Sequence, residues 1–252
     1  MNSTPARIGW IVDVQNDFAM SRAPGGRLYV HDLFDDTDPG AESVQENVVR
    51  AVQILTDRCD LMVFTGDWHG MEDEEIDPVS PDSATGTYPP HCMGRSNDPV
   101  ERIGAEILRE IRPANPVILE HDATVQDAGA VARTAVAENR AVFIHKVRFS
   151  VFEGNPSTDA FIASVHDAMA VDRIEFYVLG HARDVCVTQF IDGIQSEGRS
   201  RPRHDVVAIA DCMAGLGLES EDETLARWSR GGAEIISLDH LEARLGDGRE
   251  QD

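Results

Sequence analysis

The stretch IGWIVDVQNDF, residues 8–18, sets the fold class, because an almost wholly apolar run stops abruptly at an acidic residue, Asp13. Similar runs recur along the chain, and none of them alternates strictly between apolar and polar residues. That pattern is typical of parallel strands covered on both faces. The predicted strands are residues 8–13, 60–65, 116–120, 141–145, 174–179 and 205–210, with a short edge-strand candidate at 233–237.

Amphipathic stretches separate these runs, as in residues 41–57, where valines and a leucine repeat at helical spacing. Alternating strands and helices predict a doubly wound α/β fold: a mostly parallel, six-stranded sheet with helices on both faces. The predicted helices are residues 41–57, 99–112, 125–138, 157–169, 185–197 and 220–230.

No repeat or low-complexity tract divides the chain. We therefore expect residues 1–252 to form a single domain, with an inserted helical segment around 99–140. Two long loops, 19–40 and 66–98, interrupt the alternation, and loops of this length in a compact α/β domain are usually functional or mobile. The tail after residue 245 is expected to fray.

Composition limits the partners of the protein. The chain carries 22 basic and 45 acidic residues, a formal net charge of −23. Such a surface repels polyanions, so we exclude nucleic acid and anionic membranes as partners. The first residues resemble neither a signal peptide nor a membrane span, and the four cysteines form no zinc-like CxxC pair. We expect a cytoplasmic protein in a reducing compartment.

Ligands of an open α/β sheet bind beyond the carboxyl ends of its strands, where reactive side chains follow several predicted strands. Asp13 ends the first strand, and a half-buried carboxylate there suits a general base; a turn-forming or capping aspartate is the alternative. Lys146 is the only lysine of the chain and ends an apolar run. Its compact ammonium fits a cramped site that excludes a guanidinium, unless Lys146 is simply a surface residue.

Cys186 follows a predicted strand and the glycine turn at Gly180, in the first turn of a predicted helix with Asp184 as its N-cap. Backbone N–H groups and the positive end of the helix dipole favour a thiolate there, and the same N–H groups can hold an oxyanion. The alternative is that Cys186 is a small buried hydrophobic residue. The other three cysteines lack this setting.

Two short motifs, DWH and PPHC, offer Asp67, His69 and His91 as ligands of a metal ion. Residues at i and i+2 of an extended segment point to one side, so Asp67 and His69 can face the same ion. Mixed oxygen and nitrogen donors suit Zn, Mn or Fe. Glu75 or Asp77 could be a fourth ligand; otherwise the acidic stretch around them is a solvated loop. The alternative to a metal site is that Asp67 forms a turn and that the histidine has its hydrogen bonds satisfied within the protein.

Taken together, these motifs resemble the nicotinamidase branch of the cysteine hydrolases that share the isochorismatase-like fold. The matching segments, in the order of that family, are WIVDVQNDF, TGDWH, YPPHCMG, KVRFSVFEG and LGHARDVCV, with AIADCMAG as a weaker sixth. The resemblance covers residues 10 to about 215.

The resemblance implies roles for particular residues. It implies a catalytic triad of Asp13, Lys146 and Cys186 and a cis peptide bond between His181 and Ala182. The implied oxyanion hole is formed by the backbone N–H groups of Ala182 and Cys186. The implied metal ligands are Asp67, His69 and His91, with Glu75 at a variable fourth position, and the implied aromatic pocket residues are Phe18 and Trp68.

The implied activity is hydrolysis of a small carboxamide, most simply nicotinamide to nicotinate and ammonia in NAD salvage, by a homo-oligomeric enzyme. The sequence also departs from the family, because residues 99–140 are longer than usual, RSNDP replaces the usual pattern after PPHC, and GHARD replaces GVATD. These departures keep open a second substrate class, an N-carbamoyl or maleamic amide. A catalytically inactive acidic binding module is the third possibility.

Overall fold

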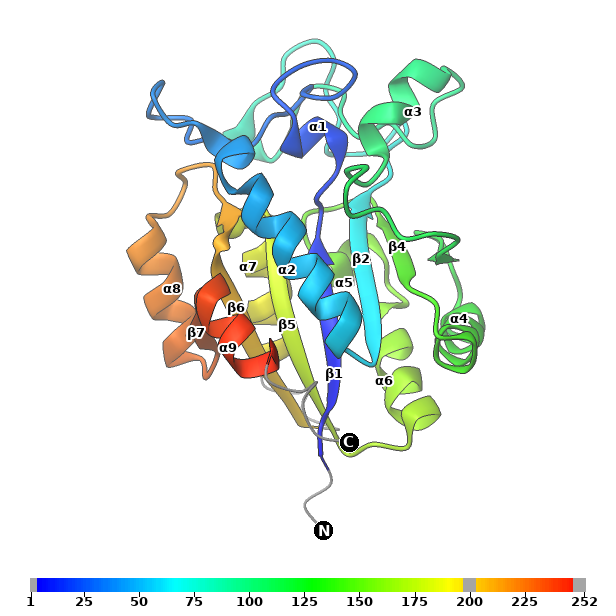
Figure 1. Cartoon of the computed structure of the whole chain (residues 1–252). Helices are drawn as coiled ribbons and strands as arrows, with labels where there is room; N and C mark the ends of the chain where they lie inside the picture. The colour runs from blue at the N-terminus through cyan, green and yellow to red at the C-terminus, as the bar shows by residue number, and fades with distance from the viewer. Residues whose placement is uncertain (1–3, 197–202, 247–252) are drawn as a thin grey trace.

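The structure is a computed structural model, and it describes residues 4–196 and 203–246. Nearly all of the predicted frayed tail, and the last residue of the predicted helix 185–197, lie outside the described residues. The described strands form one sheet in the order β3-β4-β2-β1-β5-β6-β7, and each neighbouring pair is parallel (Figure 1). The strands are β1 (Ala6–Val12), β2 (Leu61–Asp67), β3 (Val117–Leu119), β4 (Val142–Lys146), β5 (Arg173–His181), β6 (Arg203–Ala214) and β7 (Glu234–Ile236).

Helices cover both faces of this sheet, as expected for parallel strands. Within the described part of the chain, no helix combines the length and apolarity needed to cross a bilayer. The helices are α1 (Asn16–Ala19), α2 (Gln45–Arg58), α3 (Pro99–Ala105), α4 (Val125–Glu138), α5 (Val151–Gly154), α6 (Thr158–Met169), α7 (Thr188–Gln195), α8 (Glu221–Arg230) and α9 (Leu238–Gly246), with short turns η1 (Gly40–Val44), η2 (Ser83–Thr85) and η3 (Arg183–Val187).

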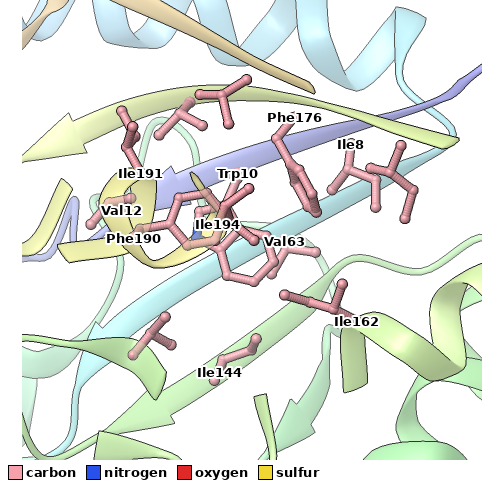
Figure 2. Close-up of a cluster of buried hydrophobic side chains, with 14 of the residues drawn as sticks. Ile8, Trp10, Val12, Val63, Ile144, Ile162, Phe176, Phe190, Ile191 and Ile194 are labelled. Atoms are coloured by element: carbon pink, nitrogen blue, oxygen red, sulfur yellow. The ribbon is translucent and has the colours of Figure 1, made fainter. Parts of the chain in front are cut away.

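Alternate residues of each central strand enter two different cores. In β1, Trp10 lies on the face covered by α4, α6 and α7, where its ring stacks on Phe190 with 4.3 Å between ring centroids (Figure 2). Ile11, the next residue, packs on the opposite face under α2 and α9. Burial on both faces explains why the strand sequences are continuously apolar.

The doubly wound parallel architecture is confirmed, with one correction to the strand count. The sheet has seven strands rather than six, because the edge-strand candidate 233–237 does pair with β6, along Val207–Ile209. Three residues are too few for periodicity to separate a strand from an extended loop. Helix α9 was not predicted, although Leu238, Leu241 and Leu245 bury its apolar face.

The predicted helix 99–112 is wrong beyond Ala105. The side chain of Gln15 donates to the Ala105 carbonyl at 2.7 Å, and the Asn16 N–H donates to the Glu106 carbonyl at 3.0 Å. These bonds from the end of β1 use carbonyl groups that a longer helix would need for its own i to i−4 bonds. Residues 106–112 instead form an irregular segment whose Ile107 packs beneath α2.

The long loops gather at the carboxyl end of the sheet, together with α1 and α3 (Figure 1). β4, β2, β1 and β5 are consecutive in the sheet, so the residues that follow them lie along one edge. The expected location of a ligand site in an open parallel sheet is therefore enclosed by loops 19–40 and 66–98.

Candidate active site

The reactive residues predicted from four strand ends meet at this edge. Asp67 and Lys146 are paired in register as the last residues of β2 and β4. Asp13 directly follows β1, and its N–H donates to the Thr65 carbonyl of β2 at 3.2 Å. Cys186 lies in the turn that follows β5. Adjacent parallel strands thus place residues from four distant parts of the chain at one point.

Lys146 is the centre of the arrangement. Its Nζ lies 2.9 Å from Asp13 Oδ2 and 3.9 Å from Cys186 Sγ, and it also forms an ion pair with Asp67. The ammonium further donates to the Arg148 carbonyl at 3.1 Å. Lys146 is 1% exposed, so the only lysine of the chain is a fully buried cation between two carboxylates and a sulfur.

The surroundings set the protonation states of the three side chains. Burial raises the pKa of the Cys186 thiol well above its ordinary value, and Asp13 adds to this, while Lys146 opposes it. Burial also raises the pKa of Asp13 against the opposing effects of Lys146 and of the 2.6 Å hydrogen bond from Thr65. Burial lowers the pKa of Lys146, but its carboxylate neighbours outweigh burial and raise it overall. The sulfur therefore rests as a thiol beside a carboxylate of enhanced basicity.

The segment around Cys186 differs in one respect from the prediction. The turn η3 has π-helical form and continues into α7, so Cys186 does lie at the start of a helical segment. Asp184 does not cap it; its carboxylate accepts the N–H groups of Leu216 and Leu218 and so holds the loop after β6. The peptide bond before Ala182 is cis, as the resemblance implies.

A second cluster adjoins the triad. Asp67, His69 and His91 are buried, and one ligand atom of each lies within 4.8 Å of the others. Asp67 Oδ2 is 3.8 Å from Nε2 of both histidines, and Glu75 Oε2 is 3.9 Å from Nε2 of His69. These separations are too long for hydrogen bonds, but two donors that share one ion at about 2.1 Å each lie up to ~4.2 Å apart.

The other ring nitrogens of the histidines are already engaged. Nδ1 of His69 lies 3.1 Å from Asp73 Oδ2, and Nδ1 of His91 lies 2.8 Å from the Pro89 carbonyl. An acceptor at Nδ1 leaves the Nε2 lone pair for a metal ion. Nε2 of His69 has no hydrogen-bond partner in the structure.

Glu75 completes the donor set. Its Oε1 accepts the Phe149 N–H at 2.9 Å, whereas its Oε2 is buried without a hydrogen-bond partner. Asp77, the alternative fourth ligand, is excluded because its carboxylate caps the N–H groups of Val79 and Ser80. Among the predicted candidates, the geometry therefore favours Glu75.

The charge balance of this region also fits a bound cation. Asp13, Asp67 and Glu75 are buried carboxylates around the single ammonium of Lys146. Burial and the charge of Asp67 raise the pKa of Glu75 to about 7. Burial lowers the pKa of His69, but its carboxylate neighbours outweigh burial and raise it to about 9. A divalent cation would displace these protons and compensate the excess negative charge.

A small cavity connects the two clusters. The space inside it that the centre of a water-sized sphere can reach is about 30 Å³, and Asp67, His91 and Cys186 border it. The predicted pocket residue Phe18 and the predicted oxyanion-hole residue Ala182 also line it. The remaining lining residues are Leu28, Val30, Tyr88, Phe149, Val185 and Leu216. None of those six was singled out from the sequence, although five of them come from the two long loops or the quoted motifs and Leu216 directly follows the motif AIADCMAG.

Trp68, the other residue of the predicted aromatic pocket, is not among the residues that line this cavity. Its ring stacks on His145, with centroids 4.0 Å apart and an angle of 7° between the planes. The reason is the alternation of an extended segment: Asp67 and His69 face the metal cluster, so the residue between them points away. Trp68 thus supports the segment that carries the two ligands.

Two further buried polar residues, also unassigned from the sequence, hold the site together. Gln15 accepts the Asp67 N–H at 2.7 Å and donates to the Asp67 carbonyl at 2.8 Å. Asp17 accepts the N–H of Cys92 at 2.7 Å, next to the ligand His91. Both residues belong to VQNDF, the second half of the stretch 8–18. Their closeness to Asp13 in the sequence is the signal that could have identified them.

The fold is that of the isochorismatase-like hydrolases, since solved structures of this description superpose along nearly the whole chain. The nicotinamidase/pyrazinamidase of Bacillus subtilis matches with a TM-score of 0.60 and 17% identity, over 92% of this chain and 100% of the other. The N-carbamoylsarcosine amidase of Thermoplasma acidophilum matches with a TM-score of 0.56 and 16% identity, over 93% and 97% of the two chains. The pyrazinamidase of Pyrococcus horikoshii, in complex with zinc, matches with a TM-score of 0.54 and 20% identity, over 92% and 99%.

No family model and no curated protein matches the sequence. The similarity to the solved structures above confirms, at the level of the fold, the resemblance inferred from the motifs.

Proposed function

We propose that the protein is a cysteine amidohydrolase that converts a small, neutral aromatic carboxamide, most simply nicotinamide, into its acid and ammonia. One observation carries the proposal: a buried ammonium lies 2.9 Å from a carboxylate and 3.9 Å from a thiol at the wall of a small cavity. A base, a nucleophile and a charge that stabilises them are the parts that thioester chemistry needs. An inactive binding module has no need for these buried charges.

In the first half of the proposed reaction, Asp13 takes the proton of the Cys186 thiol while the sulfur attacks the amide carbonyl carbon. The resulting oxyanion accepts hydrogen bonds from the backbone N–H groups of Ala182 and Cys186. When the tetrahedral species collapses, protonated Asp13 gives its proton to the departing nitrogen. Ammonia leaves, and a thioester remains on Cys186.

In the second half, Asp13 takes a proton from a water molecule that attacks the thioester carbonyl. The carbon–sulfur bond breaks, the carboxylic acid leaves, and the proton returns to the sulfur. Throughout the cycle Lys146 keeps Asp13 oriented and offsets the negative charge that builds up between Asp13 and the sulfur.

The second cluster would hold a divalent cation through Asp67, His69, His91 and Glu75. When bound, such a cation supplies a Lewis-acid contact that can orient a ring nitrogen of the substrate. The zinc complex of the Pyrococcus horikoshii neighbour supports zinc as the first ion to test.

The cavity walls favour the aromatic amide over the alternative substrates. Apart from the candidate metal ligands, the described residues that line the cavity include no Arg, Lys, Asp or Glu. N-carbamoyl amino acids and maleamic acid carry a carboxylate, which an apolar pocket binds poorly unless a cation pairs with it. The aromatic rings of Phe18, Tyr88 and Phe149 instead fit a flat ring.

The test is an ammonia-release assay on nicotinamide, pyrazinamide, an N-carbamoyl amino acid and maleamic acid, with and without a chelator. We expect kcat/KM to be highest for the two aromatic amides and to fall after metal removal. If only the N-carbamoyl amino acid and maleamic acid are hydrolysed, the substrate is an N-carbamoyl or maleamic amide and not an aromatic one. Failure of every amide, with a protein that binds zinc, would reject the amidohydrolase proposal.

A further inference from the structure

Asp73 contacts a candidate metal ligand although it does not belong to the ligand set. Its Oδ2 lies 3.1 Å from Nδ1 of His69 and also accepts the Gly70 N–H at 3.0 Å. The Asp73 N–H donates to the Gly70 carbonyl at 3.3 Å. This bond closes a backbone turn that places the Asp73 carboxylate next to the His69 imidazole. Asp73 is thus fixed relative to His69 by both side-chain and backbone contacts.

Arg95 in turn holds Asp73. The guanidinium of Arg95 forms an ion pair with Asp73 and lies 3.1 Å from Glu72. The backbone N–H of Arg95 donates to the His69 carbonyl at 3.0 Å. A second nitrogen of the same guanidinium lies 3.0 Å from Nε2 of His121. Because arginine can only donate, His121 accepts there.

These contacts join the metal cluster to the part of the chain where it departs from the family pattern. Arg95 opens the RSNDP segment, and His121 lies between β3 and α4, inside the 99–140 region. His91 offers an internal comparison, since its Nδ1 meets the neutral Pro89 carbonyl instead of a carboxylate. An anionic acceptor makes the opposite ring nitrogen a stronger donor to a metal than a neutral acceptor does.

We propose that Asp73, held by Arg95, is a positioning residue that orients His69 and sets how tightly the protein binds its metal ion. The proposal rests on the proposed function only in taking Asp67, His69, His91 and Glu75 as a metal site. It does not require that the substrate be an amide.

Zinc affinity, measured by competition with a chromophoric chelator, tests this role directly. Asp73→Ala should weaken zinc binding by about 10- to 100-fold, the range found for acceptors behind a ligating histidine. Asp73→Asn, whose amide oxygen can still accept from Nδ1, should lie between Asp73→Ala and the wild type. Arg95→Met should weaken binding by only several-fold, because Asp73 keeps its bond from Gly70.

Asp77→Asn is the matched control, because it removes the same charge from the same loop at a carboxylate that caps Val79 and Ser80. Thermal unfolding of the metal-free proteins shows whether each variant folds like the wild type. If the metal-free variants fold normally, saturating zinc should restore the amidase activity of Asp73→Ala.

Equal zinc affinity in Asp73→Ala and Asp77→Asn would overturn the proposal, as would a loss of activity that saturating zinc does not restore. If Asp73→Ala does not fold, Asp73→Asn is compared with Asp77→Asn instead. Equal zinc affinity of these two variants would likewise overturn the proposal. A wild type that binds zinc tightly but hydrolyses no amide would reject the proposed reaction and leave this test intact.

Discussion

A histidine pair at the amino end of the sheet and the ion cluster at its carboxyl end bury ionisable side chains in opposite ways. At the amino end, His204 at the start of β6 meets His166 of α6, with 3.0 Å between their Nε2 atoms. Burial lowers the pKa of His204 to about 4, so the pair is held neutral. At the carboxyl end, Lys146 remains a buried cation because Asp13 and Asp67 lie against it.

The two sites differ in the charge state of their buried groups. This difference separates a site that contributes to stability from a site that can carry out chemistry. A buried group normally loses its charge, and the histidine pair follows that rule. The carboxyl end keeps several charges close together and leaves Nε2 of His69 and Oε2 of Glu75 without hydrogen-bond partners. Unsatisfied buried atoms are costly and point to a ligand that completes them.

The largest expected effect comes from removing the nucleophile. Cys186→Ala should lower the rate of ammonia release by roughly 10⁴-fold or more, since loss of a covalent nucleophile removes the whole pathway. Cys59→Ala, at the end of α2, is the matched control and should retain wild-type turnover. Comparable turnover in the two variants would mean that the buried thiol at the carboxyl end has no catalytic role.

The next effect concerns the buried cation. Lys146→Met leaves Asp13 and Asp67 without their partner, so the free energy of unfolding of the metal-free protein should fall by about 3–5 kcal/mol. Arg148→Met, which breaks only an exposed ion pair with Glu74, should cost about 0–1 kcal/mol. Chemical denaturation of both variants measures the contrast, and equal losses would show that Lys146 is an ordinary surface-type cation.

A smaller effect separates the candidate fourth ligands. Glu75→Gln replaces an anionic donor by a neutral amide, and we expect zinc affinity to fall by about 100-fold. Asp77→Asn should leave zinc affinity unchanged. A chelator competition series on the two variants measures the contrast, and equal zinc affinities would show that Glu75 is not a ligand.

The smallest effect belongs to the amino end and gives the baseline for the comparison. The pKa of His204 is lowered from 6.5 to about 4, mainly by burial and by His166, while Asp159 and Asp205 oppose the shift. The unfolded chain therefore binds more protons between pH 6.5 and 4, and stability falls as the pH falls through this window. After solvent screening, we expect a loss of about 1–2 kcal/mol.

Urea unfolding at pH 7 and pH 4.5 measures that loss, and His204→Gln should reduce it. A pH dependence that is unchanged in His204→Gln would show that the histidine pair does not account for it.

Most of the sheet could be predicted because its strands are apolar runs that end in turn signals: six predicted runs coincide with β1 to β6, and the edge-strand candidate 233–237 coincides with β7. The triad could be predicted for a related reason: Asp13 and Lys146 mark strand ends, and Cys186 follows the next strand. Parallel pairing then brings those ends together without any further information.

The errors arise where tertiary contacts override local pattern. Residues 106–112 have helical periodicity, but bonds from Gln15 and Asn16 take the carbonyls that the helix would use. Asp184 has the position of an N-cap, yet it binds a loop some thirty residues further along the chain. Such long-range partners are invisible to a single sequence.

A thioester at Cys186 is the central intermediate of the proposed reaction, so trapping it is the most direct test. Nicotinamide and the metal-loaded enzyme would be mixed, quenched rapidly in acid, digested and examined by mass spectrometry. We predict a nicotinoyl group on the peptide that contains Cys186 and none on the peptides of Cys59, Cys92 or Cys212. Steady release of ammonia with no acyl group on Cys186 at any quench time would contradict the account.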